Sequence, residues 1–466
     1  MSQAQNVTTI NPATGEELAT YETISKDQVT HIIKKSKDAF REWKKDWKRR
    51  TEILQIVSQE LRKQSNKLAE VATKEMGKPI KESRSELIKC SWAMEFYADN
   101  GQVFLNDEVL NTDARKSIIA FEPLGVIGSI MPWNFPYWQA LRFAAPSLAA
   151  GNTIVLKPAS ATLQCGIEIE NILAEAGVPS GVFQTAVGNS SVAGHILDSD
   201  VSGITFTGST EVGIKVGQKA AGGLKKCVLE LGGSDPFIVC SDADVDKAAE
   251  GAVKGRFINC GQSCVASKRF FVAKNVADSF IEKFVKNTEK LKVGDPLSED
   301  TDIGPLVNKG GLETIDEQVD DARKHNAQIL TGGERIGDKG FFYKPTIVGG
   351  VTKEMKVGYE ETFGPVAAIT VVEDERNAIK YANDTCFGLG ASLWTQDLVK
   401  ADKYSRLIES GMVSVNNVLV SDPRIPFGGV KKSGFGRELS RYGMLEFVNM
   451  KSIRYYDQLV RTHFVE

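Results

Sequence analysis

The stretch GITFTGSTEVGIKVGQKAAGG, residues 203–223, decides the fold of this chain. It begins with a short apolar run, continues through a turn of Gly, Ser and Thr, and ends in a segment whose apolar residues recur at helical spacing. A strand that passes through a glycine turn into a helix is typical of a parallel sheet with helices on its faces. The stretch therefore predicts an α/β domain.

Similar apolar runs stand on both sides of it. They are short, they close on Gly, Pro or Asn, and helical stretches lie between them. Those of the first region are GVIGSIMPW (125–133), NTIVLKP (152–158), VFQTAVG (182–188) and CVLELGG (227–233). Near-continuous apolar strands that alternate with helices predict a parallel, doubly wound sheet. Ahead of them, residues 26–76 read as helices, the last of which ends at Gly77 and Pro79.

A second alternating region follows. Its predicted strands are PFIVC (236–240), KRFFVA (268–273), AQILTGG (327–333), PTIVGG (345–350), VAAITVV (366–372) and GASLWT (390–395). The length of 466 residues also favours more than one domain. We therefore predict two α/β domains that meet near residue 232.

The composition is that of an ordinary globular protein. Apolar residues make up 42%, charged residues 25%, and the formal net charge is −3, so nothing favours nucleic acid or an anionic membrane as a partner. No apolar run reaches the roughly 18 residues of a membrane helix. The N-terminus lacks a basic region followed by an apolar stretch, so the expected location is the cytoplasm.

The cysteines and histidines do not form a metal-binding pattern. There are seven cysteines, an odd number at irregular spacing, and four isolated histidines. A zinc site requires short-spaced pairs of such residues, and a disulfide framework favours an even number of cysteines. We predict neither. Cys260 and Cys264, in FINCGQSCVASKRFF (257–271), are small buried residues, or one of them is a nucleophile, and their spacing leaves a disulfide between them open.

Four polar stretches follow apolar runs, where the ligands of such sheets bind. FTGSTEVG (206–213) can hold a phosphate at a helix N-terminus, although Ser or Thr there also caps a helix and the spacing is not G-x-G-x-x-G. Lys157 ends a buried strand and reaches either solvent or a ligand. Glu230 interrupts an apolar strand and is either an exposed or paired carboxylate or a general base. Asn134 caps a turn or offers its amide to an oxyanion.

Seven stretches together resemble the aldehyde dehydrogenase superfamily over essentially the whole chain. They come in that family's order, and LELGGSDPFIV (229–239) and FGGVKKSGFGRELS (427–440) look most like bacterial and archaeal succinate-semialdehyde dehydrogenases. The seven are MPWNFP (131–136), LKPAS (156–160), ITFTGSTEVG (204–213), LELGGSDP (229–236), NCGQSC (259–264), EETFGPV (360–366) and PFGGVKKSGFGRE (426–438).

The resemblance implies a role for individual residues. Cys264 matches the nucleophile, Glu230 the general base and Asn134 the oxyanion donor, which acts together with the Cys264 backbone N–H. The implied cofactor residues are Trp133, Lys157, Ser160, Gly208, Ser209, Glu361 and Phe363. They would hold NADP or NAD: Lys157 and Glu361 at the two riboses, Gly208 and Ser209 at the pyrophosphate and Phe363 beside the nicotinamide.

The resemblance also implies the domain organisation and a homodimer or homotetramer. Residues 1–102 and 121–232 would form the NAD(P)-binding domain, and residues 233–430 the catalytic domain. Residues 103–120 and 431–466 would form a small β oligomerisation element, with the last strand near 447–458. We therefore expect two Rossmann-like domains and an oligomerisation element.

Three positions bear on the cofactor and the substrate. Ser160 stands where many NAD-dependent members have a glutamate that repels a 2′-phosphate, so NADP is expected to be accepted and a preference for it stays open. Arg142 matches an arginine that reaches the carboxylate of succinate semialdehyde. Ile258 replaces a second such arginine, and Arg256, Arg424 and Ser421 are candidates to compensate, with Arg142 and Ser421 as the predicted substrate-binding residues.

The predicted reaction is NAD(P)-dependent oxidation of an aldehyde to a carboxylic acid through a Cys264 thioester. Succinate semialdehyde is the expected substrate, and glutarate semialdehyde or a neutral aldehyde is the alternative. A CoA-acylating enzyme is a rival, but it does not need the base Glu230. A non-catalytic scaffold is a second rival, and it would be expected to lack Cys264 or Glu230.

Overall fold

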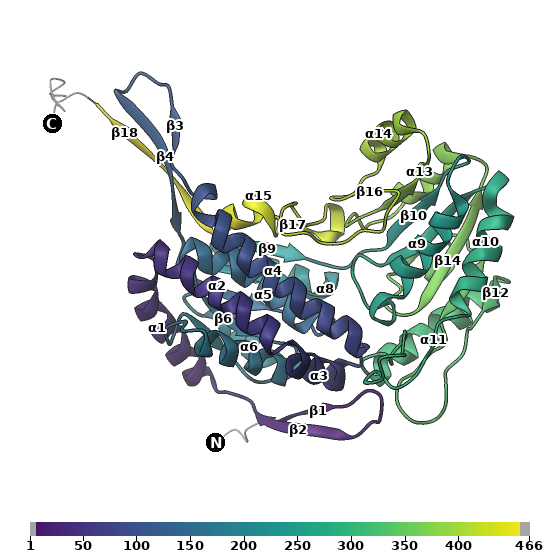
Figure 1. Ribbon diagram of the computed structural model, residues 1–466, viewed down its shortest axis with the longest axis horizontal. Coiled ribbons are helices and arrows are strands. Elements are labelled where there is room, and N and C mark those ends of the chain that lie inside the picture. Colours follow the sequence, from purple (N-terminus) through teal and green to yellow (C-terminus); the bar gives the residue numbers. More distant parts are fainter. Residues whose placement is uncertain (1–5, 457–466) are drawn as a thin grey trace.

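The computed structural model describes residues 6–456 of the chain (Figure 1). Two large sheets with helices on their faces form the body of the molecule, and a small three-stranded sheet projects from it. A hairpin of β1 (Asn6–Ile10) and β2 (Glu17–Glu22) lies beside the N-terminal end.

The first large sheet has the strand order β17-β9-β8-β5-β6-β7. Its parallel strands are β5 (Val126–Ile130), β6 (Thr153–Lys157), β7 (Phe183–Thr185), β8 (Gly203–Thr207) and β9 (Lys226–Glu230). The chain moves outward from β5 to β7, and then returns to β8 on the other side of β5. The predicted doubly wound sheet is therefore confirmed, and β5 and β8 flank the point where the winding reverses, which is where such sheets bind ligands.

Helices cover this sheet. Those within the winding are α5 (Pro136–Ala150), α6 (Leu163–Glu175), α7 (Ser190–Asp198) and α8 (Thr210–Gly222). The predicted N-terminal helical region contains α1 (Lys26–Trp43), α2 (Trp47–Lys63) and α3 (Ser65–Met76), followed by α4 (Ile80–Phe104). Gly77 ends α3 in the left-handed conformation, with φ 82°, as glycine does at helix ends.

The second large sheet has the order β12-β13-β14-β11-β10-β15-β16 and is parallel except for β12. Its strands are β10 (Asp235–Val239), β11 (Ser267–Ala273), β12 (Gln328–Thr331), β13 (Thr346–Gly349), β14 (Val366–Val372), β15 (Ser392–Trp394) and β16 (Ser414–Val415). Its helices are α9 (Val245–Phe257), α10 (Lys274–Thr288), α11 (Lys309–Lys324), α12 (Lys356–Tyr359), α13 (Glu375–Asn383) and α14 (Leu398–Leu407). Both sheets contain the strands that the apolar runs predicted.

The small sheet consists of β3 (Glu108–Leu110), β4 (Lys116–Pro123) and β18 (Val448–Tyr455), paired antiparallel. It extends away from the body in Figure 1. The predicted oligomerisation segment 431–466 divides into two parts, because β17 (Gly434–Phe435) pairs with β9 in the first large sheet. The helix α15 (Ser440–Leu445) follows β17, and residues 457–466 lie outside the described range.

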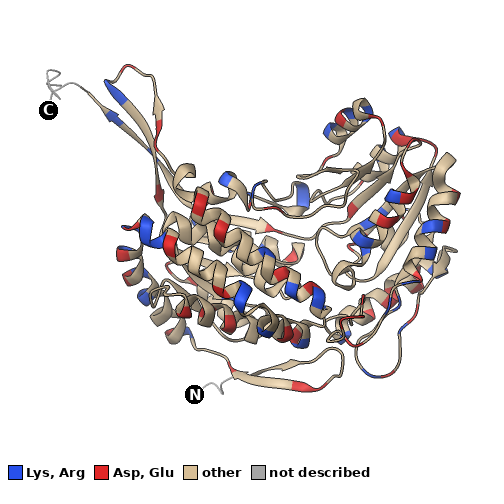
Figure 2. Cartoon of the chain, in the orientation of Figure 1, with Lys and Arg blue, Asp and Glu red and all other residues tan. Residues whose placement is uncertain are grey.

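The two halves of the body contact each other at the start of α4. The backbone N–H of Ile80 donates to the carbonyl of Pro296 at 2.7 Å, and a Cβ on Gly304 would lie 1.9 Å from the carbonyl oxygen of Gly77. This close approach fixes α4 against the second half of the chain. Charged side chains lie mostly on helices and loops, with both signs mixed (Figure 2). Within residues 6–456 no helix is long and apolar enough to cross a membrane.

Candidate active site

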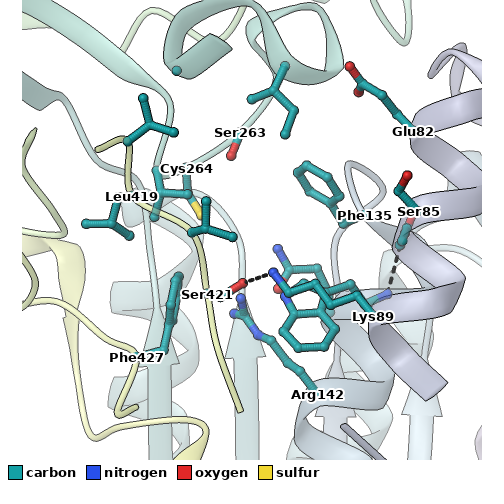
Figure 3. Close-up of a pocket in the computed structure, with 18 of the residues that line it drawn as sticks. Glu82, Ser85, Lys89, Phe135, Arg142, Ser263, Cys264, Leu419, Ser421 and Phe427 are labelled. Atoms are coloured by element: carbon teal, nitrogen blue, oxygen red, sulfur yellow. Dashed lines mark hydrogen bonds between the residues drawn. The ribbon is translucent and has the colours of Figure 1, made fainter. Parts of the chain in front are cut away.

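A cavity of about 230 Å³ lies between the two halves of the body (Figure 3). Its walls come from α4, α5, the loop that follows α9, and the segment 418–421. Three residues predicted from the sequence line it together, namely Cys264, Arg142 and Ser421. Ile258 also lines it, so the position that lacks the second arginine does face this cavity.

The loop that carries Cys264 has an unusual backbone. Asn259, Cys260 and Gly261 are successive residues in the left-handed conformation, with φ of 51°, 55° and 73°. This conformation is unfavourable for residues with a Cβ. At Gly261 a Cβ would lie 2.2 Å from the carbonyl oxygen of Gly364, so the site requires glycine. The chain is thus held in a strained turn just before its candidate nucleophile.

Buried side chains hold this turn in place. Arg256 donates to the carbonyl oxygens of Gly261 at 2.7 Å, Gly364 at 2.8 Å and Ser267 at 3.1 Å. Asn259 donates from its amide to the carbonyl of Asn134 at 2.7 Å. The Arg256 bonds are charge-assisted and therefore stronger than neutral ones, and together with the Asn259 bond they offset the strain of the turn. The suggestion that Arg256 compensates for the missing substrate arginine is wrong, because its guanidinium is fully buried against backbone carbonyls and does not line the cavity.

The Cys264 thiol is half-buried at the cavity wall. Burial raises its pKa to about 11, while the positive charges of Arg142 and Lys268 lower it and Glu230 raises it. The Lys268 ammonium donates to the Cys264 carbonyl at 2.7 Å. In this structure the thiol is therefore protonated at neutral pH, and the reactive thiolate is a minor species.

Cys260 lies in a different environment. It is 1% exposed and packs in the core of the second half, whereas Cys264 packs against the core of the first half. Burial raises the pKa of the Cys260 thiol. The two cysteines are unpaired here, and their side chains belong to separate apolar clusters, which does not favour a disulfide between them.

Glu230 ends β9 as a buried carboxylate. It is 2% exposed, so the reading as an exposed edge residue is wrong. Neither of its oxygens has a hydrogen-bond partner among residues 6–456, and Oε1 lies against the backbone at Gly428, where a Cβ would approach it to 2.7 Å. Burial raises its pKa well above the usual range, and the like charge of Glu438 acts in the same direction. Such a carboxyl group can accept a proton near neutral pH.

Asn134 lies directly beside the Cys264 loop. Its amide nitrogen donates to the carbonyl of Gln262 at 3.1 Å, and the residue is 3% exposed. An amide nitrogen carries two N–H groups, and the Asn134 nitrogen uses one of them for a hydrogen bond within the described chain. One donor therefore stays available next to the nucleophile.

Arg142 lines the cavity from α5 but already has a counter-charge. It forms an ion pair with Glu438, and its guanidinium lies 4.6 Å from the centre of the Phe427 ring. Its Nη2 has no hydrogen-bond partner among the described residues. Arg142 can therefore donate to a ligand through this nitrogen while it neutralises Glu438.

Ser421 contacts a cation that the sequence analysis did not identify. The Lys89 ammonium, from α4, donates to its hydroxyl at 2.6 Å (Figure 3). The same ammonium lies 4.4 Å from the centre of the Trp138 ring. The third candidate, Arg424, is exposed and pairs with Asp422 outside this cavity. Lys89 was missed because no motif or spacing in α4, which contains one other lysine, Lys81, marks it as a functional residue.

Five of the seven predicted cofactor residues lie at the carboxyl ends of β5, β6 and β8, and Glu361 and Phe363 come from the loop between α12 and β14. Lys157 ends β6, Ser160 begins the short helix Ser160–Thr162, and Ser209 caps α8 after Gly208. Trp133 contacts Phe363 edge to face, with ring centres 5.7 Å apart. The remaining residue, Glu361, accepts from the backbone N–H of Gly233 at 3.0 Å and pairs with Lys268 at 3.4 Å.

This edge fits an anionic dinucleotide. Burial lowers the pKa of Lys157 to about 8, and its ammonium has the Pro158 carbonyl, at 2.7 Å, as its partner in the described chain. The hydroxyl of Thr207, at the end of β8, is buried without a partner there. A helix N-terminus, an incompletely paired lysine and an unpaired hydroxyl at one sheet edge suit ribose and phosphate groups. The residues present therefore fit NAD(P).

One group of side chains within residues 6–456 has the types of atoms that bind metal ions, but its two carboxylates are paired with a lysine. Cys240, Asp242 and Glu375 lie close together. Lys400 donates to Glu375 at 2.9 Å and to Asp242 at 3.4 Å, so both carboxylates already have a cation. This cluster does not point to a metal ion.

Comparisons with known proteins agree with this geometry. Residues 1–453 match the sequence profile of the Aldehyde dehydrogenase family. A succinate semialdehyde dehydrogenase [NAD(P)+] of Escherichia coli K12 is 40% identical over 457 residues, which cover 97% of this chain and 98% of that protein. A probable succinate-semialdehyde dehydrogenase [NADP(+)] of Synechocystis sp. is 44% identical over 449 residues, with 96% and 99% covered.

A solved structure shares the fold of this chain. It is the succinic semialdehyde dehydrogenase of Streptococcus pyogenes in complex with NADP+, with a TM-score of 0.94 and 36% identity over 97% of this chain and 100% of that one. The predicted fold, the predicted enzyme class and the predicted NADP or NAD dependence are thereby confirmed. The chain belongs to the aldehyde dehydrogenase family.

Proposed function

We propose that this chain oxidises succinate semialdehyde to succinate with NADP+ or NAD+, with Cys264 as the nucleophile. One observation carries the proposal: a single cavity brings the Cys264 thiol together with cationic and hydroxyl groups that suit a carboxylate. The names of the relatives support the same substrate.

The first step is attack of the Cys264 thiolate on the aldehyde carbon. A C–S bond forms, and the carbonyl π electrons move to the oxygen, which becomes an oxyanion. The free N–H of Asn134 and the backbone N–H of Cys264 are the proposed donors to this oxygen. The proton lost from the thiol passes to solvent or to Glu230.

Loss of hydride from the resulting thiohemiacetal leaves a thioester on Cys264. When bound, the nicotinamide of NAD(P)+ accepts that hydride. Glu230 then takes a proton from a water molecule as the water attacks the thioester carbon. The C–S bond breaks, the carboxylic acid is released, and the Cys264 thiolate is regenerated. The raised pKa and unbonded oxygens of Glu230 support this role as base.

The cofactor preference and the assembly belong to the same proposal. A serine at position 160 places no negative charge at the edge that would receive a 2′-phosphate, so NADP+ is accepted beside NAD+. The arm of β3, β4 and β18 exposes Val109, Leu110 and Met450 by 75%, 47% and 60%, which supports a homodimer or homotetramer. An odd number of irregularly spaced cysteines supports the reducing cytoplasm as its location.

The test is a panel of aldehydes assayed with NAD+ and with NADP+, with identification of the acid. Succinate semialdehyde should give succinate without CoA and should have the highest kcat/KM. Cys264→Ala should lose this activity to background, while Cys260→Ala should keep it in every fraction that folds. A need for CoA, or comparable activity in Cys264→Ala, would overturn the proposal.

A further inference from the structure

Lys89 is a cation of the cavity wall without an anionic partner. It projects from α4, its ammonium donates to the Ser421 hydroxyl at 2.6 Å, and it lies over the Trp138 ring at 4.4 Å. No carboxylate of residues 6–456 lies within ion-pair distance of it. A hydroxyl and an indole face compensate an ammonium group less well than water or a carboxylate does.

The other charged groups around the cavity are engaged or in solvent. Glu86 pairs with Lys78 and accepts the backbone N–H groups of Tyr137 and Trp138 at 2.9 and 2.8 Å. Glu82 accepts the backbone N–H of Asn259 at 2.8 Å.

Among the cations, Arg142 pairs with Glu438, and Lys254 is exposed, so water screens its charge. Lys89 is therefore the cation of this wall that is both largely shielded from water and not neutralised.

The environment of Lys89 already disfavours its charged form. Burial lowers its pKa to about 8, and the positive charge of Arg142 acts in the same direction, against the weaker opposite effect of Asp422 and Glu86. A bound carboxylate would reverse this cost, because an opposite charge at short range stabilises the ammonium.

The position of Lys89 along the cavity suits one end of a substrate. Lys89 and Ser421 line both the inner cavity and an outer opening, which is formed with Arg62, Trp92 and Asp422. Cys264 lines the inner cavity and not the outer opening. In Figure 3, Cys264 and Lys89 enter the cavity from different elements on opposite sides. A short molecule with an aldehyde at Cys264 would thus direct its other end toward Lys89 and Ser421.

We infer that the Lys89 ammonium, together with the Ser421 hydroxyl, binds the distal carboxylate of the substrate and selects semialdehydes of dicarboxylic acids over neutral aldehydes. This inference rests on the proposed function and assigns its substrate recognition to a residue of α4. Arg142 then serves mainly to neutralise Glu438, with its free Nη2 as a secondary donor.

The decisive measurement is the ratio of kcat/KM for succinate semialdehyde to kcat/KM for butanal, which has the same carbon count and no carboxylate. Loss of a hydrogen bond to a charged group predicts that Lys89→Met lowers this ratio by about 10- to 150-fold. Lys89→Arg should retain most of the ratio. The matched control Lys254→Met removes the exposed lysine of the same cavity and should change the ratio by no more than about twofold.

A second measurement does not depend on turnover. Calorimetric titration of succinate into the folded protein should give a Kd that Lys89→Met raises by a similar factor and Lys254→Met leaves nearly unchanged. An equal loss of kcat/KM for both aldehydes in Lys89→Met would overturn the inference, as would an unchanged ratio together with an unchanged Kd. Arg142 would then be the residue expected to bind the carboxylate. A wild-type ratio near one would instead refute the proposed substrate, so the two failures are distinguishable.

Discussion

Two sets of polar side chains lie around Cys264 and the cavity beside it, and they differ in the partners of their hydrogen bonds. Arg256, Asn259 and Gln262, which we call the clamp, bond mainly to backbone carbonyls of the left-handed turn and of neighbouring loops. Arg142, Glu230 and Lys89, which we call the open wall, are buried or half-buried with polar atoms that lack a partner or a counter-charge in the described chain.

The difference separates fixing a geometry from performing chemistry. Side chains bonded to backbone hold the nucleophile in one place before a substrate arrives. Buried groups with unused bonding capacity cost stability in the empty site, and a substrate or a water molecule can relieve that cost. The clamp therefore should govern whether the loop folds correctly, and the open wall should govern which reaction follows.

The strongest test of this division is Glu230→Gln in the open wall. An amide cannot take a proton from water, so steady-state turnover should fall by about 10²- to 10⁴-fold. Thiol attack and hydride loss precede the water step, so a stopped-flow trace should keep a burst of reduced cofactor. A trace with no burst would show that Glu230 acts before the thioester forms, and unchanged turnover would remove it from the mechanism.

The clamp is tested by Arg256→Met. Loss of its bonds leaves several buried carbonyls unsatisfied, and the free energy of unfolding should fall by at least about 3 kcal/mol. Arg269→Met is a matched control, because Arg269 is also buried and donates to three carbonyls, those of Ser234, Tyr381 and Ala382, away from this cavity.

Denaturant unfolding should show a comparable loss of stability in both arginine variants. The remaining folded protein should lose burst amplitude in Arg256→Met and keep it in Arg269→Met. Equal burst amplitudes in the two variants would mean that the clamp contributes stability alone and does not position Cys264.

The smallest expected effect concerns the protonation state of the Cys264 thiol, which lies between the clamp and the open wall. Because burial raises its pKa to about 11, the thiol is mostly protonated at pH 7, and the thiolate fraction grows about tenfold for each pH unit up to that pKa. Iodoacetamide labelling of the protein without cofactor, read at the Cys264 peptide by mass spectrometry, should accelerate accordingly from pH 7 to pH 9. A plateau below pH 9 would show that Arg142 and Lys268 activate the thiol before any ligand binds.

Local patterns in the sequence predicted the architecture well. Near-continuous apolar strands and glycine turns identify a doubly wound sheet because burial on both faces leaves no polar positions in such strands. Gly77 and Pro79 located the end of α3 because glycine and proline end helices through their own backbone conformations. The division of 431–466 between the body and the arm was not predictable in this way, because β17 pairs with a strand about 200 residues earlier in the chain.

The sequence by itself determined the family, the fold and the candidate nucleophile, because these depend on contiguous motifs and on apolar periodicity. The tertiary structure decided the charges around that nucleophile. In the folded chain Arg142 forms an ion pair with Glu438, and Arg256 bonds to the carbonyls of the left-handed turn. Lys89 of α4 contacts Ser421, a residue 332 positions away in the sequence. Whether a cation is neutralised or available depends on which groups lie within a few ångströms of it in the folded chain, and spacing along the sequence does not contain that information.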